Sequence, residues 1–287
     1  MKKTNYIFAS LLFIALAILL LGCSNTPHAH STEPTIICEH PIETEEAMFE
    51  TSNVEPAIIE TQPEPDENVS FDISYVDDGE AMPYALLAPS SANADTSIPL
   101  IVWLHGMDEQ NLPEDSFLKT GLTEIIMNWE LDYFNAYIIC PQMKGNYYAD
   151  SWSNPKAEEN LAILLDKFIS EHNVDLDKII VSGSSLGGQG AIYMAVEMAD
   201  YFDRAVVFSG YGSTAKCSDI EIPVLGYLGT REKNEYIIKF MKCSFAPEEN
   251  CLFKTLATSR FELPTVAFNL DEDENGMSDI VEWMLSD

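Results

Sequence analysis

The segment best suited to covalent chemistry is Gly183-Ser184-Ser185-Leu186-Gly187. It fits the pattern Gly-x-Ser-x-Gly, in which a serine at a sharp turn between a strand and a helix presents its hydroxyl to a substrate. A serine hydroxyl is a poor nucleophile until a neighbouring base removes its proton. The spacing therefore predicts Ser185 as a nucleophile and raises the question of which residue activates it.

No histidine follows Ser185 in this chain. The five histidines all precede it: His28, His30, His40, His105 and His172. Enzymes with such a serine usually place their general base after it in the sequence. The sequence therefore predicts a hydrolase scaffold in which activity is weak or lost.

A second motif, near the C-terminus, has the spacing of a calcium-binding loop. Residues 271–282 fit D-x-[DN]-x-[DN]-G-x₅-E at every defined position, and Gly276 supplies the sharp turn. The residues expected to supply oxygen ligands are Asp271, Asp273, Asn275, Met277 (through its carbonyl), Asp279 and Glu282. The helix 278–285 would leave the loop, whereas the segment entering it is expected to be a strand. We therefore expect structural calcium and no organic cofactor.

The N-terminal residues have the features of a targeting segment. Lys2 and Lys3 precede an apolar stretch over 7–21, which is too short for an ordinary membrane span. The following Leu20-Leu21-Gly22-Cys23 resembles a bacterial lipoprotein signal, which implies cleavage after residue 22 and acyl chains such as palmitate on Cys23. Ordinary secretion with an incidental cysteine is the alternative. The expected location is extracytoplasmic, at the cell envelope, with the membrane contacted only through the lipid.

Residues 23–70 are predicted to form a disordered stalk. Between 24 and 70 there are eleven acidic residues, six prolines and no Lys or Arg, so too little apolar surface is available to offset the entropy of ordering. The formal net charge of the whole chain is −32. So large a negative charge argues against nucleic acid as a partner, because its phosphates would be repelled. Residues 71–287 are enough for one domain with a sizeable core.

Strands and helices alternate through that domain, which predicts a mostly parallel sheet with helices on both faces. An N-terminal hairpin is expected from strands 71–76 and 82–88 around Asp77-Asp78-Gly79. Further strands are expected at 99–104, 136–140, 178–181, 204–208, 224–228 and 252–256, and helices at 158–169, 186–198, 233–241 and 278–285.

The strand 178–181 and the helix 186–198 place the serine motif at a strand-to-helix turn. Such a helix directs its first free amides at the site, so the amide of Leu186 is expected to stabilise a developing oxyanion. A second amide is expected from the loop after strand 99–104, where Leu104-His105-Gly106-Met107 lies. The loop 145–155, with Tyr147, Tyr148 and Trp152, suggests aromatic walls for the pocket.

Four segments in order resemble the α/β-hydrolase superfamily: Leu104-His105-Gly106, Cys140-Pro141-Gln142, Trp152, and 177–188 with the serine motif. The likeness is closest to the secreted esterase and predicted-peptidase group, which includes polyhydroxybutyrate-depolymerase-like and feruloyl-esterase-like enzymes. It implies an α/β-hydrolase fold, a Ser185 nucleophile, and Met107 and Leu186 as oxyanion donors.

The resemblance also implies where the rest of a catalytic triad would lie. The acid follows the strand after the serine unit, where Glu232 is the candidate, although it could equally be a helix-capping glutamate. The histidine would fall within Ala257–Pro264, where the nearest cation is Arg260, and a guanidinium keeps its proton at neutral pH. Two hypotheses remain open. One is a surface-anchored serine esterase with weak or lost activity, and the other a non-catalytic pseudo-hydrolase that binds a small ester, a glycan or a peptide.

Overall fold

The computed structural model describes residues 70–80, 82–93, 95–129, 134–145, 151–211, 219–244, 251–272 and 277–286, all within the unit Cys38–Asp287. Cys23, the expected signal peptide and nearly all of the expected stalk lie outside the described residues, as do Tyr147 and Tyr148. In the described ranges, no helix combines the length and apolar character needed to cross a bilayer.

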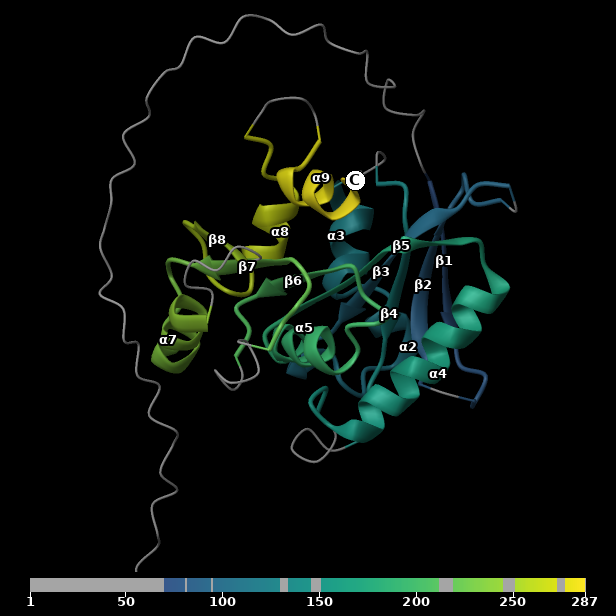
Figure 1. Cartoon of the computed structure of the whole chain (residues 1–287), viewed down its shortest axis with the longest axis horizontal. Coiled ribbons are helices and arrows are strands. Elements are labelled where there is room, and N and C mark those ends of the chain that lie inside the picture. The colour runs from purple at the N-terminus through teal and green to yellow at the C-terminus, as the bar shows by residue number, and fades with distance from the viewer. Residues whose placement is uncertain are drawn as a thin grey trace, which may run out of the picture. The chain divides into compact units, whose positions relative to one another are not determined.

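An eight-stranded sheet in the order β1-β2-β4-β3-β5-β6-β7-β8 forms the centre of the domain (Figure 1). β1 pairs antiparallel with β2, and β2 pairs antiparallel with β4, whereas every pairing from β4 through β8 is parallel. The predicted mostly parallel sheet with an N-terminal hairpin is therefore confirmed. The strands are β1 Phe71–Val76, β2 Tyr84–Pro89, β3 Ile98–Leu104, β4 Tyr137–Pro141, β5 Val174–Ser184, β6 Arg204–Phe208, β7 Val224–Gly229 and β8 Cys251–Leu256.

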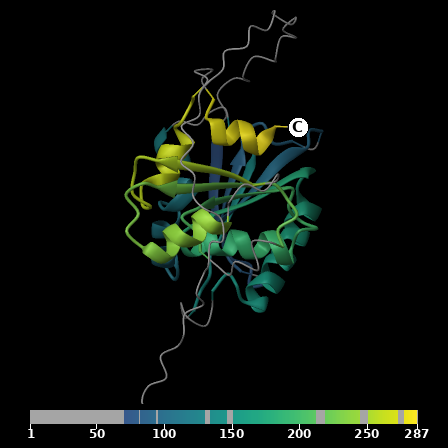
Figure 2. The same cartoon turned by 60° about the vertical axis from the view of Figure 1, so that its left-hand side comes forward.

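Helices cover both faces of the sheet (Figures 1 and 2). On one face lie α4 Pro155–Glu171, α5 Leu186–Glu197 and α7 Glu235–Ser244; on the other lie α3 Gly121–Trp129, α8 Leu263–Phe268 and α9 Asp279–Leu285. Two short elements, η1 Met107–Glu109 and α2 Glu114–Phe117, follow β3. Because helices cover both faces, central strands such as β4 and β7 are buried at every position, which explains their unbroken apolar sequence.

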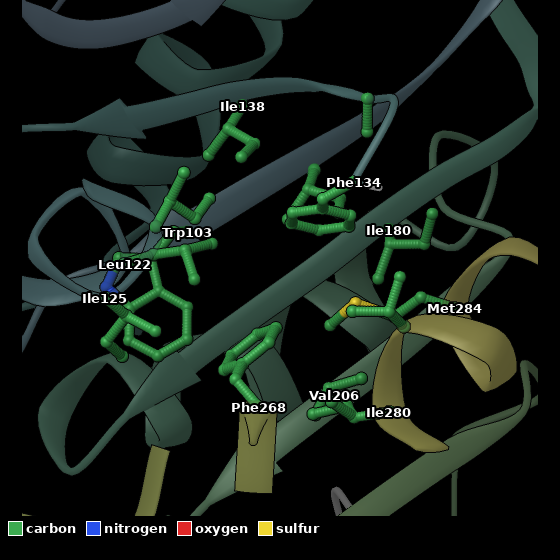
Figure 3. Close-up of a cluster of buried hydrophobic side chains, with 14 of the residues drawn as sticks. Trp103, Leu122, Ile125, Phe134, Ile138, Ile180, Val206, Phe268, Ile280 and Met284 are labelled. Atoms are coloured by element: carbon green, nitrogen blue, oxygen red, sulfur yellow. The ribbon is translucent and has the colours of Figure 1, made fainter. Parts of the chain in front are cut away.

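The face covered by α3, α8 and α9 contains an aromatic core (Figure 3). Trp103 of β3 and Phe208 of β6 lie 5.8 Å apart between ring centroids, and Phe268 of α8 packs on both, at 6.5 and 6.0 Å. Ile280 and Met284 of α9 are fully buried against the sheet. This core fixes the end of β3, where the candidate site begins.

The structure corrects three expectations about the elements. α3 and α8 were not expected, and β5 begins at Val174 rather than at 178, so the site strand is longer than its apolar stretch suggests. The segment entering 271–282 contains the helix α8, not a strand, because Leu263, Pro264, Ala267 and Phe268 place one buried face on the core. Helices therefore both precede and follow this loop.

Candidate functional site

Ser185 occupies the turn between β5 and α5, where its backbone has φ 56° and ψ −112°. A positive φ is rare for a residue with a Cβ and costs about 1–3 kcal/mol. Two hydrogen bonds hold the turn: Ser185 N donates to the Phe208 carbonyl at 3.0 Å, and Gln189 N donates to the Ser185 carbonyl at 3.0 Å. The predicted strand-to-helix elbow is therefore present, with the serine in the strained backbone conformation that such a turn requires.

Two glycines allow this turn to pack against the end of β3. A Cβ on Gly187 would lie 1.7 Å from the Leu104 carbonyl oxygen, and a Cβ on Gly183 would lie 2.5 Å from the carbonyl carbon of Gly187. Both positions are closed to any side chain, because the obstacles are backbone atoms that cannot move aside. The glycines of the motif therefore bring α5 into direct contact with the loop that carries Met107.

The amides of Met107 and Leu186, the predicted oxyanion donors, each lie at the start of a helix. Met107 is the first residue of η1 and Leu186 is the first residue of α5, so neither amide has a partner within its own helix. Within the described ranges, no hydrogen bond from either amide is found. Met107 lines the same cavity as Ser185, and Leu186 is the next residue in the chain.

The carboxyl of Glu109 holds the Met107 loop in place, a role that we had not expected. Its Oε2 accepts a hydrogen bond from Gly106 N at 2.7 Å, which is the glutamate half of a capping box at the start of η1. Burial raises the pKa of Glu109, and the hydrogen bond from Gly106 only partly opposes that effect. The spacing Gly106-x-x-Glu109, a cap residue followed three positions later by glutamate, is the sequence signal that could have identified it.

His105 is fully engaged beneath this loop. It is 1% exposed, its Nδ1 lies 2.6 Å from the Gly106 carbonyl, and its Nε2 accepts a hydrogen bond from Met143 N at 3.0 Å. These partners require a neutral ring with the proton on Nδ1. Burial lowers the pKa of His105 to about 4, and both ring nitrogens are occupied by backbone groups. His105 therefore positions the loop and does not serve Ser185 as a base.

The only other histidine in the described ranges, His172, lies at the opposite end of β5. It caps the C-terminus of α4, and its ring stacks on Phe168 with centroids 4.0 Å apart. Its Nδ1 lies 3.0 Å from the Phe168 carbonyl oxygen. Since β5 begins at Val174 and ends beside Ser185, the length of the strand separates His172 from the serine hydroxyl. Within the described ranges, no side chain forms a hydrogen bond with Ser185 Oγ.

Ser185 opens into a cavity of about 540 Å³. Arg260 lines this cavity together with Ser185 and Met107, so the loop after β8 contributes to the same cavity and carries an arginine where the resemblance implies a histidine. The guanidinium of Arg260 lies 4.9 Å from the ring centroid of Phe261. The rest of the lining includes Trp103, Asp108, Glu109, Glu124, Ile125, Tyr211, Asn234, Tyr236, Ile237 and Pro264.

Glu232 lies in the turn after β7, as expected for the acid of a triad. Its Oε1 accepts hydrogen bonds from the amides of Lys233 and Asn234, both at 2.8 Å. Its Oε2 is buried and has no partner in the structure. The adjacent Arg231 N donates to the Thr258 carbonyl at 3.0 Å, which ties this turn to the loop that carries Arg260. The contacts of Glu232 are compatible with both expected roles, the acid of a triad and a capping glutamate. One carboxylate oxygen caps the turn, and the other has no partner among the described residues.

The expectation that Trp152 forms a wall of the pocket is wrong. Trp152 is completely buried, and its Nε1 donates a hydrogen bond to the His105 carbonyl at 3.0 Å. A Cβ added to Gly190 of α5 would lie 2.4 Å from the Cβ of Trp152. Trp152 therefore packs between α5 and the loop that carries His105. The aromatic residues that line the cavity are instead Trp103, Tyr211, Tyr236 and Phe261, which come from separate parts of the sequence.

The loop 271–282 is described only at its two ends. Asp271, Met277, Asp279 and Glu282 lie within the described residues, whereas Asp273, Asn275 and Gly276 lie outside them. Asp279 Oδ1 accepts a hydrogen bond from Glu272 N at 2.8 Å, and Asp279 Oδ2 lies 3.0 Å from Lys254 Nζ. Within the described ranges, no group of three or more His, Cys, Asp or Glu side chains is arranged to hold a metal ion. Lys254, which the sequence did not suggest, is thus a cation that already pairs with one predicted ligand.

Comparison with known proteins places this site in context. The Esterase family model, described as "Putative esterase", matches residues 78–255. Comparison with curated proteins gives no significant match.

Solved structures with the same fold include three that carry hydrolase names. A thermostable esterase is 20% identical, with a TM-score of 0.53 over 75% of this chain and 59% of that chain, so the chain spans less than two thirds of its length. The Staphylococcus aureus fluorophosphonate-binding serine hydrolase FphF, substrate bound, is 13% identical, with a TM-score of 0.54 over 77% and 100% of the two chains. A feruloyl esterase module from Clostridium thermocellum complexed with sinapinate is 14% identical, with a TM-score of 0.50 over 73% and 91%.

The half-buried carboxyl of Glu109 leads to a prediction about pH. Because its pKa is raised in the folded chain, the folded state keeps this proton to a higher pH than the unfolded chain does. Glu109 therefore lowers the free energy of unfolding as the pH rises from the ordinary glutamate range through the raised pKa. Glu109→Gln retains an oxygen to accept from Gly106 N and should remove this decline. Urea unfolding between pH 4 and pH 8 measures it, with the exposed Glu114→Gln as the matched control; a Glu109→Gln curve parallel to that of the wild type would contradict the assignment.

Proposed function

The chain belongs to the Esterase family of α/β-hydrolases, and we propose that it is a lipid-anchored protein of the cell envelope whose carboxylic-ester hydrolase site has lost most of its activity. The observation that carries this proposal is the presence of Arg260, instead of a histidine, in the cavity of Ser185. The expected ligand is a small molecule with an ester, glycan or peptide group.

The site has groups that could stabilise the oxyanion of an ester-cleavage reaction, but among the described residues it has no group to accept the proton of the serine hydroxyl. Ester cleavage requires Ser185 Oγ to form a bond to the carbonyl carbon while the amides of Met107 and Leu186 bind the resulting oxyanion. The hydroxyl proton must then pass to a base and on to the departing alcohol as the ester C–O bond breaks. Arg260 has no lone pair for that proton, and both described histidines are committed elsewhere. The residual rate would come from the oxyanion hole and from binding alone.

A non-catalytic pseudo-hydrolase is the second candidate function. Within the described ranges, Arg260 forms no ion pair with a carboxylate, so its charge is available to a ligand. An unpaired charge on a cavity wall contributes more to binding than to the stability of the fold.

Replacing Arg260 by histidine should restore esterase activity. An imidazole at that position would lie in the Ser185 cavity, and the unused Glu232 Oε2 could accept its N–H and orient the ring. General-base catalysis contributes about 10²–10⁴-fold, so we expect kcat/KM for a p-nitrophenyl ester to rise by about 10²-fold in Arg260→His. Arg260→His combined with Ser185→Ala or with Glu232→Gln should lose the gain.

Two results would contradict this account of the site. One is brisk hydrolysis by the native chain that Ser185→Ala abolishes, since an activated serine would then exist without a histidine. The other is rapid labelling of native Ser185 by a fluorophosphonate, because capture at the serine requires the same activation. Slow labelling that accelerates in Arg260→His supports both the site and the lost base.

The lipid anchor rests on the sequence Leu20-Leu21-Gly22-Cys23, which lies outside the described residues. Incorporation of an alkyne-labelled palmitate during expression in a bacterial host tests it. We expect label and membrane association in the native chain and loss of both in Cys23→Ser. Cys140→Ser, at a buried thiol of the folded domain, is the matched control. A Cys23→Ser chain that still carries the label would rule the anchor out.

Calcium in the loop 271–282 is likewise a proposal, supported by the motif and by the helices that precede and follow it. Calcium that binds the folded chain and not the unfolded chain raises the melting temperature in a concentration-dependent way. We expect a rise at millimolar calcium in the native chain and none in Asp271→Ala. Lys254→Met should enhance the rise, because Lys254 competes for Asp279. An identical shift in Asp271→Ala would place the ion elsewhere.

A further inference from the structure

The wall of the cavity next to Ser185 presents several hydrogen-bond donors that no described residue satisfies. These are the Ser185 hydroxyl, the amide of Met107 and the guanidinium of Arg260. The amide of Leu186, the residue after Ser185, also has no described partner. Arg260 is the only Lys or Arg among the described residues that line the cavity. The donors come from three separate elements, so their convergence is a property of the tertiary structure.

Taken together, these donors suit a carboxylate better than a neutral ester. A neutral ester carbonyl offers one good acceptor oxygen, which the two amides would occupy, and leaves the guanidinium without a charged partner. A carboxylate offers two oxygens and a full negative charge, so one oxygen can lie at the amides while the other pairs with Arg260. The positive end of the α5 dipole adds to the preference for an anion.

The remaining walls determine which end of such a ligand lies at Ser185. Asp108 and Glu124 both interact electrostatically with Glu109, so the η1 and α3 side of the cavity holds three neighbouring acidic groups. Apolar side chains complete the lining, among them Trp103, Ile125, Ile237 and Pro264, and they suit an uncharged hydrocarbon body.

We propose that the Ser185 cavity binds an apolar carboxylic acid as its carboxylate, with Arg260 as the residue that makes it prefer the free acid over the ester. This inference rests on the proposed function, because it uses the Ser185 site, and it assigns the ligand class of that site. In such a chain the replacement of histidine by arginine converts a site for cleaving esters into a site for retaining acids.

The test compares ligands that share one hydrocarbon body: hexanoate, hexanamide and methyl hexanoate, titrated into the full folded chain by calorimetry or by NMR. We expect hexanoate to bind about tenfold more tightly than hexanamide, since a charge-assisted hydrogen bond to Arg260 is stronger than a neutral one. Arg260→Gln should reduce the affinity for hexanoate to that for hexanamide and leave hexanamide unchanged. Arg231→Gln, an exposed arginine that does not line the cavity, is the matched control and should keep the preference.

Equal affinity for hexanoate and hexanamide in the native chain would overturn the inference, and so would an equal loss in Arg231→Gln and Arg260→Gln. These results leave the proposed function intact, because the gain of activity in Arg260→His is measured independently. Conversely, a selective hexanoate site with no gain of activity in Arg260→His would retain this inference and remove the lost-base account of the site. Thermal unfolding of each variant confirms that the chain remains folded.

Discussion

The carbonyl of Leu104, at the end of β3, approaches the first turn of α5 so closely that only glycine fits at position 187. This contact joins the two halves of the site, since β3 leads into the Met107 loop and α5 begins immediately after Ser185. It also makes the strained backbone of Ser185 necessary, because a relaxed turn would move α5 away from β3. The positions of the Met107 and Leu186 amides relative to Ser185 therefore depend on this backbone contact.

The hydrogen bonds around the Met107 loop explain why His105 cannot act as a base for Ser185. His105 binds the Gly106 carbonyl and the Met143 amide, while its carbonyl accepts from Trp152. Moving the ring towards Ser185 would leave buried backbone groups without partners, at a cost of about 1–3 kcal/mol each. His105 is therefore committed to holding the loop after β3 and is not available for proton transfer.

The sequence predicted those elements whose structure is determined by residues close together in the chain. β3, β6 and the elbow between β5 and α5 were predicted because buried strands are unbroken apolar segments and the elbow needs glycine at fixed spacing. α8 was missed because it has six residues, with a proline in its first turn and β-branched neighbours, so its identity comes from packing on Phe208 and Trp103. The loop after β8 lines the same cavity as Ser185, whereas the burial of Trp152 and the role of Glu109 depend on contacts between distant segments.

Arg260 has no ion pair within the described ranges, although the chain is strongly acidic. In a sequence with 47 acidic and 15 basic residues, an arginine that lines a cavity beside three acidic groups would be expected to pair with one of them. Within the described ranges it does not, and its guanidinium lies over Phe261 instead. Stacking leaves the in-plane N–H groups of a guanidinium available, whereas an ion pair with a wall carboxylate would occupy them. Glu109 is meanwhile held by the Gly106 amide, so one acid of the lining is bound to backbone instead of to Arg260. The same backbone contacts that build the hydrolase scaffold thus keep the one cation of the described cavity lining available to a ligand.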